Sequence, residues 1–388
     1  MAPVKKDDTL GGMPLLNEDD IKALIAENAI GAISVDTSVF DKYQCNLESQ
    51  ALLGLGQFRG TATRLVLSEV IAGEVKSHIE REAAESQVKL KSALAQVRKG
   101  WRIVVDHPAV DAALGIQQTP AAYAADAFAT FIGVVQPEII GVDGLVTHAE
   151  TLRRYFAAAP PFSTSEIKKN EFPDALALLS LEAWAEQNNT TVLTVSRDKD
   201  WQTFADASNR LICVSDLGVA LDYFNQEARF IVTRAVGLLR QGAAADLFDE
   251  IESSIERFLE TFDPEVDGYA SLDYDVENLE PSLQHWEVAE GDPKILYAHG
   301  DTVVFALSLN ALVNFSATFR YSVFDGVDRD MVDIGSDTKE VEQAITIPVV
   351  ISIDREIDPE PVVHRIDITP PRVVIEFGSI DPNWGPEE

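Results

Sequence analysis

The chain has 388 residues, of which 46% are hydrophobic, and a formal net charge of -33. This length exceeds what one hydrophobic core usually organises, so we predict two domains. Residues 1–224 carry 20 Lys and Arg against 30 Asp and Glu, whereas residues 225–388 carry 11 against 34. This acidity excludes general nucleic-acid binding, because Lys and Arg supply most sequence-independent affinity for phosphate. Any bound nucleic acid must meet a local basic surface.

The sequence shows no apolar stretch that is long enough for a signal peptide or a membrane span, so we expect a cytoplasmic protein without membrane contact. The two cysteines, Cys45 and Cys213, lie far apart and lack metal-type spacing. This usage is typical of a reducing compartment, and it excludes a zinc site built from cysteines.

Helices and strands alternate over the first 225 or so residues. Asn17 predicts the start of a helix over 17–28, and Pro173 suits the first turn of a helix over 173–187. Further helices are predicted after Ser68, from Ile79 toward Trp101, over 109–132, around Arg153, and near 217–225. Buried strands are predicted at 29–36, 64–68, 138–142, from 192, and at 210–216. This alternation predicts an α/β domain with a parallel sheet covered on both faces.

The pattern changes after a helical stretch at about 227–262. Residues 263–292 contain ten acids and no Lys or Arg, which we interpret as a solvated loop rather than an acidic partner-binding segment. Apolar residues then alternate with polar ones over 315–323, 345–353 and 373–377, which predicts a small antiparallel sandwich or barrel. We therefore expect an α/β domain over 1–226, a helical connector over 227–262, and an acidic, mainly β domain of unknown role over 263–388.

Several acids are expected at one edge of the predicted sheet, beyond the carboxyl ends of its strands, where ligands bind in open parallel sheets. They are Asp36, Glu74, Asp174 and Asp198, with Asp200 as a fifth candidate. Each alone has an ordinary explanation, as a helix cap, a surface residue, a partner of a helix dipole, or part of a solvated turn. Together, converging carboxylates need a compensating cation, and hard oxygen ligands select Mg²⁺ or Mn²⁺.

Four short motifs occur in one order: VDTSVF, SEVIAGEV, FPDALALL and TVSRDKDW. With them, the stretch from about Ile30 to Phe224 resembles the PIN family of nucleases, and the long stretch from 76 to 135 resembles a helical insert of larger bacterial members. The resemblance implies that Asp36, Glu74, Asp174 and Asp198 are catalytic metal ligands, with Asp200 beside them and Ser196 as a nearby hydroxyl. Ser38 stands where the family often has Asn, so its role is open.

The resemblance further implies a divalent-metal-dependent endoribonuclease, in which metal-activated water cleaves RNA to 5′-phosphate ends, as in a toxin or a defence effector. The predicted RNA path comprises basic residues in the insert and beside Asp174, and solvated helix faces explain them equally well. They are Lys76, Lys89, Lys91, Arg98, Lys99, Arg153, Arg154, Lys168 and Lys169. A regulatory or inhibitory protein and a second copy of the chain are further candidate partners.

Two other functions compete with this one. Haloacid dehalogenase-like phosphatases also place Asp after a first strand, but they commonly need a second Asp two residues later, where this chain has Ser38. Alternatively, the PIN-like domain is an inactive scaffold and the acidic β domain binds a protein. The acidic second half also prompts the hypothesis that it shields the basic insert as an RNA mimic.

Overall fold

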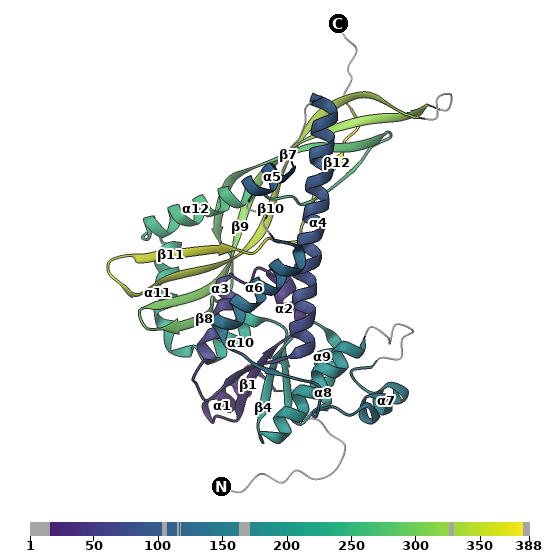
Figure 1. Ribbon diagram of the computed structural model, residues 1–388. Helices are drawn as coiled ribbons and strands as arrows, with labels where there is room; N and C mark the ends of the chain where they lie inside the picture. Colours follow the sequence, from purple (N-terminus) through teal and green to yellow (C-terminus); the bar gives the residue numbers. More distant parts are fainter. Residues whose placement is uncertain are drawn as a thin grey trace. The chain divides into compact units, whose positions relative to one another are not determined.

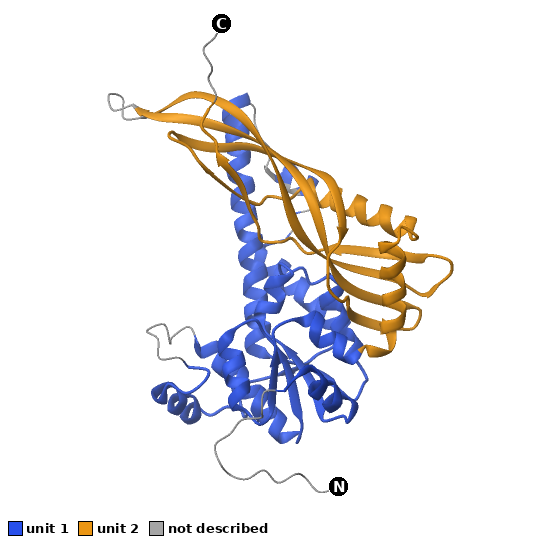
Figure 2. Ribbon diagram, turned by 180° about the vertical axis from the view of Figure 1, so that it is seen from behind, with its two compact units in different colours: residues 1–224 blue, residues 225–388 orange. Residues whose placement is uncertain are grey.

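The structure is a computed structural model that describes residues 16–102, 107–114, 116, 118–162, 171–325 and 330–382. The chain divides into two compact units, residues 1–224 and residues 225–388 (Figure 2). Each unit has its own sheet. In the described part of the chain, no helix is long and apolar enough to cross a membrane.

The first unit is built on a five-stranded parallel sheet with the strand order β3-β2-β1-β4-β5 (Figure 1). The strands are β1 (Ile30–Val35), β2 (Arg64–Ser68), β3 (Glu138–Ile140), β4 (Thr191–Val195) and β5 (Leu211–Val214). β1 and β4 are buried over almost their whole length, as expected of apolar strands with helices on both faces. The predicted α/β class is confirmed.

The helices of this unit begin where the sequence places their caps. Asn17 caps α1 (Glu18–Ala26) in a capping box with Asp20, and the Ser68 hydroxyl accepts the Val70 N–H at the start of α4 (Glu69–Trp101). The remaining α-helices are α2 (Thr37–Lys42), α3 (Gln50–Leu53), α5 (His107–Ala113), α6 (Pro120–Val135), α7 (His148–Ala157), α8 (Phe172–Gln187), α9 (Lys199–Ala207) and α10 (Leu217–Phe224). A short 3₁₀ helix, η1 (Gly54–Phe58), precedes β2.

α4 is one continuous helix of 33 residues, which joins the two helical segments predicted from Ser68 and from Ile79. Its buried residues are Ile71, Ala72, Val75 and Ile79, all in its first third. Of the apolar stripe predicted from Ile79 toward Trp101, Ile79 is buried, whereas Val97 is 43% and Trp101 79% exposed. Most of the insert helix therefore presents its side chains to solvent.

The second unit is an antiparallel sheet with helices packed on it (Figure 1). After a 3₁₀ turn, η3 (Gln226–Ala228), come α11 (Arg229–Arg240), α12 (Ala245–Leu259), β6 (Glu265–Tyr269), β7 (Asp273–Val288), β8 (Lys294–His299), β9 (Thr302–Asp325), β10 (Asp330–Ile357), β11 (Pro361–Ile368) and β12 (Val374–Ser379). The sheet order is β11-β10-β9-β7, with β8 also paired to β9, and β12 pairs with β6 in parallel. The mainly β class is confirmed, and among the described residues both the helices α11 and α12 and the two-stranded sheet of β6 and β12 pack against the five-stranded sheet.

The acidic stretch 263–292 is not the solvated loop that its charge predicts. Most of it forms β6 and β7, and β7 pairs with β9 along nearly its whole length. Leu279, Leu283 and Trp286 pack on the core of this unit, whereas neighbouring acids such as Glu280 and Glu287 are exposed. The acids thus lie on the solvent side of an edge strand, where like charges are hydrated and also discourage edge-to-edge pairing.

Candidate metal centre

Asp36 directly follows β1, where its carboxylate is held by hydrogen bonds from three groups. Its Oδ1 accepts the Thr37 N–H at 2.6 Å, and its Oδ2 accepts the hydroxyls of Ser38 and Ser196, each at 2.7 Å. The side chain is buried, and burial raises the pKa of Asp36 although these hydrogen bonds partly lower it. Asp36 therefore caps α2 and is also fixed in orientation, so capping does not exclude a role as a ligand.

Ser196 links the end of β1 to the end of the neighbouring strand β4. Besides donating to Asp36, its Oγ accepts the Asp198 N–H at 3.0 Å. Asp198 in turn caps α9, since its Oδ1 accepts the Asp200 N–H at 2.7 Å. The sequence interpretation allowed a turn here and missed α9, although Trp201, Phe204 and Ala205 are spaced as the buried face of a helix.

Glu74 lies in the second turn of α4, and a residue of α2 holds it. The Thr37 hydroxyl donates to Glu74 Oε2 at 2.8 Å, across 37 residues of sequence. Thr37 was not among the predicted site residues. The sequence does show that Thr37 is the first residue of a helix and directly follows the capping Asp36. Nothing in the sequence, however, indicates that its hydroxyl contacts Glu74.

Asp174 lies in the first turn of α8, and its Oδ1 accepts the indole N–H of the fully buried Trp201 at 2.9 Å. Burial and the negative charges of Asp36, Asp198 and Glu74 raise the pKa of Asp174 to about 7. The same causes, with Asp198 and Glu171 as the neighbouring charges, raise the pKa of Asp200. The carboxylates therefore lie within electrostatic reach of one another, although they come from four separate segments.

Among the described residues, no Lys, Arg or His forms an ion pair with these five acids. Asp216, just beyond β5, is different. Lys42 Nζ lies 2.6 Å from its Oδ2, and although burial raises the pKa of Asp216, Lys42 and two backbone N–H groups bring it below its ordinary value. The acids around Asp36 lack such a partner in the described chain.

A cluster of carboxylate and hydroxyl oxygens without a paired cation fits a hard divalent ion such as Mg²⁺ or Mn²⁺. The acids do not form a closed cage, however. Within the described residues, one group of three or more acidic, His or Cys side chains has all its ligand atoms within 4.8 Å of one another. That group is Asp41, Cys45 and His78, and it includes none of the five acids. The five acids therefore form an open rim, in which protein oxygens would be only some of the ligands.

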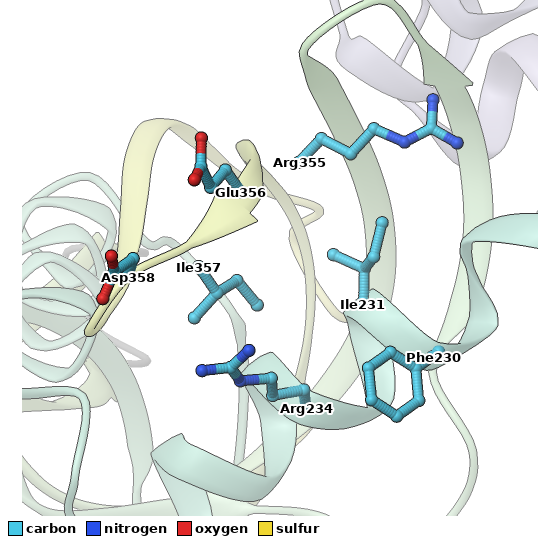
Figure 3. Close-up of a pocket in the computed structure, with 7 residues that line it drawn as sticks. All are labelled: Phe230, Ile231, Arg234, Arg355, Glu356, Ile357 and Asp358. Atoms are coloured by element: carbon cyan, nitrogen blue, oxygen red, sulfur yellow. The ribbon is translucent and has the colours of Figure 1, made fainter.

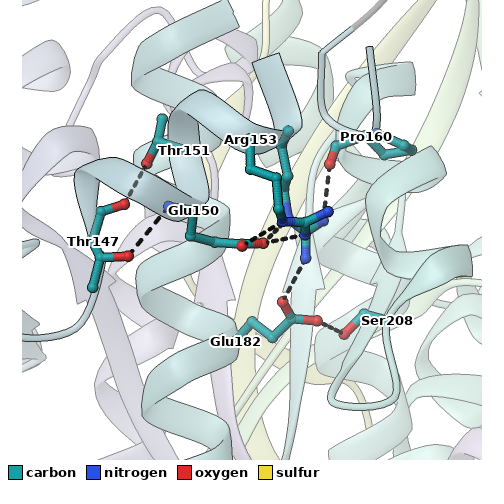
Figure 4. A network of polar contacts seen from close by, with 8 residues as sticks. Thr147, Glu150, Thr151, Arg153, Pro160, Glu182 and Ser208 are labelled. Atoms are coloured by element: carbon teal, nitrogen blue, oxygen red, sulfur yellow. Dashed lines mark hydrogen bonds and ion pairs between the residues drawn. The ribbon is translucent and has the colours of Figure 1, made fainter. Parts of the chain in front are cut away.

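The basic residues predicted to bind RNA are in different environments. Arg154 is held by Glu150, Glu182 and the Pro160 carbonyl. Arg153 pairs with Glu150, as Figure 4 shows. Hydrogen bonds from both arginines lower the pKa of Glu150 to about 2. Arg154 thus has a structural role that the sequence did not reveal. Lys168 and Lys169 lie outside the described residues.

The basic residues of α4 are exposed but do not share one face. At about 100° per residue around a helix, Lys76, Lys91 and Arg98 fall within roughly 60° of one another, and Lys89 lies nearly opposite. Lys99 lies about 140° from Lys76. Of these five predicted RNA-binding residues, three therefore form one stripe along α4, and two lie apart from it.

The second unit has a pocket of different chemistry (Figure 3). It is lined by Phe230, Ile231, Arg234, Arg355, Glu356, Ile357 and Asp358. The lining contains two arginines and two acids, so the pocket has no excess of either charge. It supplies no group of metal ligands within the described residues.

A parallel sheet that gathers acids beyond the carboxyl ends of its central strands defines a class of α/β protein with an acidic, metal-compatible site. The family model described as "PIN domain" matches residues 33–201, from within β1 to the start of α9. Residues 33–201 of the first unit are thus identified as a PIN domain. PIN domains are generally nucleases that use divalent metal ions. Searches of curated proteins and of solved structures found no match.

Proposed function

We propose that this protein is a divalent-metal-dependent endoribonuclease whose metal is held by Asp36, Glu74, Asp174 and Asp198, with Asp200 beside them. One observation carries the proposal. Three side-chain hydrogen bonds, Ser196 to Asp36, Thr37 to Glu74 and Trp201 to Asp174, tie four segments into one rim. A purely structural set of acids would be expected to pair with cations, as Asp216 does.

The residues of the rim have distinct roles in this proposal. Ser38 and Ser196 orient the Asp36 carboxylate, Thr37 orients Glu74, and the Trp201 indole orients Asp174. When bound, Mg²⁺ or Mn²⁺ would lower the pKa of a coordinated water and offset charge on the scissile phosphate. Because the outer hydroxyls fix the ligands before the metal arrives, little reorganisation is needed when it binds.

RNA would approach the acidic rim along the positively charged part of α4. Lys76 lies two residues beyond Glu74, and Lys91 and Arg98 continue the same stripe by about 33 Å, at 1.5 Å per residue. Lys89, Lys99 and Arg153 would add backbone contacts outside the stripe, and Arg154 would mainly hold α7 in place. Basic residues on a helix attract phosphate without reading sequence, so affinity is expected to fall with added salt.

The test is cleavage of a 5′-labelled single-stranded RNA by the full chain with Mn²⁺. Asp36→Asn and Asp198→Asn should each reduce the rate at least about 100-fold, since each removes a ligand charge while keeping side-chain size. Asp143→Asn is a matched control, because Asp143 is an exposed Asp of the same unit outside the rim. Equal cleavage by all four proteins would assign the activity to a contaminant and refute the proposal.

The inactive-scaffold alternative makes a different prediction in the same assay. If the first unit only supports the acidic second unit, the wild type should not cleave RNA with Mn²⁺ or Mg²⁺. It should also show no Mn²⁺ binding at the rim. Cleavage that is lost in both rim variants would exclude the scaffold.

A further inference from the structure

A second cluster of ligand-type side chains lies one helical turn from the rim. Asp41 is in α2, Cys45 follows that helix, and His78 is in α4, four residues after Glu74. Their ligand atoms all lie within 4.8 Å of one another. Nitrogen, sulfur and oxygen donors thus meet from two helices, although the spacing of the cysteines gave no sign of a metal site.

The three side chains converge on a single oxygen. His78 Nδ1 lies 2.8 Å from Asp41 Oδ1, and Cys45 Sγ lies 3.7 Å from the same atom. Both contacts are hydrogen bonds to a carboxylate, so protons lie in the space between the ligand atoms. The backbone places Cys45 there, since Gln44 and Cys45 both have a left-handed φ and the Cys45 N–H returns to the Phe40 carbonyl.

We propose that Asp41, Cys45 and His78 form a structural zinc site that clamps α2 to α4. Thiolate, imidazole and carboxylate together are a set that Zn²⁺ accepts, whereas Mg²⁺ and Mn²⁺ avoid sulfur. Binding would release the Cys45 thiol proton to solvent and form a zinc–sulfur bond. His78 would bind through Nδ1, with its proton moved to Nε2. Glu82, one turn further along α4, or a water molecule would complete the coordination.

The distances fit an ion of this size. Zinc–ligand distances of about 2.0 Å to oxygen and nitrogen and 2.3 Å to sulfur give tetrahedral edges of about 3.5 Å for S···O and 3.3 Å for N···O. The observed separations are 3.7 Å from Cys45 Sγ to Asp41 Oδ1 and 2.8 Å from His78 Nδ1 to that oxygen. The distance from His78 Nδ1 to Asp41 Oδ1 would therefore lengthen by about half an ångström, and the third separation, from Cys45 Sγ to His78 Nδ1, is within 4.8 Å.

A catalytic thiol is the competing explanation, and the contacts oppose it. In a Cys–His nucleophile, the thiol donates to the imidazole, whereas here both Cys45 and His78 are hydrogen-bonded to Asp41. The Cys45 side chain is also buried, and burial with the nearby Glu82 and Asp41 charges raises its pKa to about 12. A reactive cysteine lies instead in a partly exposed, electropositive environment that lowers the pKa of its thiol.

The clamp would act on the rim through the two helices that it joins. Asp36 caps α2 and Glu74 precedes His78 in α4 by one turn, and α2 packs against α4. The Thr37–Glu74 hydrogen bond already joins these helices on the rim side. A zinc ion between Asp41 and His78 would add a second bridge and restrain Asp36 relative to Glu74.

The site is tested by titrating the full, chelator-treated chain with Co²⁺, whose bond to a thiolate gives a charge-transfer absorption in the near ultraviolet. The wild type should show this band at one equivalent, and Zn²⁺ should remove it. Cys45→Ser should abolish the band, His78→Gln should weaken Co²⁺ affinity at least about tenfold, and Cys213→Ser should keep both. No RNA is involved, so failure of the nuclease proposal leaves this result interpretable.

A band that is absent in the wild type, or unchanged in Cys45→Ser, would overturn the proposal. Circular dichroism shows whether each variant folds. If Cys45→Ser does not fold, His78→Gln decides, because it keeps the thiol and removes one ligand. Unchanged Co²⁺ affinity in that variant would show that Asp41 and His78 form an ordinary ion pair beside a packed thiol.

Discussion

Replacing Asp174 with Asn should stabilise the metal-free protein, although Asp174 is a proposed ligand. Asn has nearly the same shape and keeps an oxygen that can accept the Trp201 indole N–H, so the hydrogen bond survives. It removes a carboxylate that burial and the charges of Asp36, Asp198 and Glu74 disfavour. The folded state without metal is therefore relieved of an electrostatic penalty.

The pKa of Asp174 in the folded state is about 7 against an ordinary 3.8. Between these values the folded state binds a proton that the unfolded state does not, so stability falls as pH rises from about 4 to 7 and is flat above. A shift of roughly three units corresponds to at most about 4 kcal/mol at pH 8. Solvent screening of this partly exposed group reduces the expected gain to roughly 2 kcal/mol at pH 8, and to about half that at pH 5.

Thermal unfolding by calorimetry, with chelator present, measures this difference. A gain of about 2 kcal/mol should raise the unfolding temperature of the first unit by roughly 4–8 °C at pH 8. Mn²⁺ should then stabilise the variant less than the wild type, because a ligand charge is gone. Asp143→Asn is the control. An Asp174→Asn variant that is no more stable at pH 8 than the wild type, or whose gain is independent of pH, would refute the converging-carboxylate argument.

Three further predictions follow from individual contacts. Thr37→Val should reduce RNA cleavage roughly 10–100-fold, because Glu74 loses its orienting hydroxyl, and Thr37→Ser should restore most of the rate; equal rates for all three proteins would remove Thr37 from the site. Lys42→Met should destabilise the first unit by roughly 1–3 kcal/mol in denaturant titrations, since Asp216 loses its cation, and an unchanged midpoint would argue against that pairing. Trp286→Ala should cost the second unit about 3–5 kcal/mol, measured in the same way, and a smaller loss would contradict the packing of β7 on its core.

The sequence predicted the elements of the first unit well because their signals are local. Asn17 and Ser68 are caps, Pro173 begins a helix, and the apolar runs of β1 and β4 are long enough to identify. Asp36, Asp174 and Asp198 were singled out for the same reason, since each follows a predicted strand or opens a predicted helix, whereas Glu74 was singled out through its motif. Their roles as metal ligands stay a prediction that the comparisons do not test.

Contacts between distant segments could not be predicted. Nothing near Thr37 in the sequence points to Glu74, and nothing near Cys45 points to His78. The acidic stretch in β6 and β7 was wrongly predicted to be a loop because its net charge is high and its alternation of apolar and polar residues is weak. Its apolar residues form a buried face only because β7 pairs with β9. In the same way, the sequence did not reveal that Arg154 is also held by Glu182, which lies 28 residues away.

The central claim is that acids from four segments hold one kind of cation together. Calorimetric titration of the chelator-treated chain with Mn²⁺ tests it most directly, in parallel with Asp36→Asn, Asp143→Asn and Cys45→Ser. We predict binding to the wild type, to Asp143→Asn and to Cys45→Ser, with at least about tenfold weaker binding to Asp36→Asn. Equal Mn²⁺ affinity in the wild type and Asp36→Asn, or no binding to the wild type, would contradict the account.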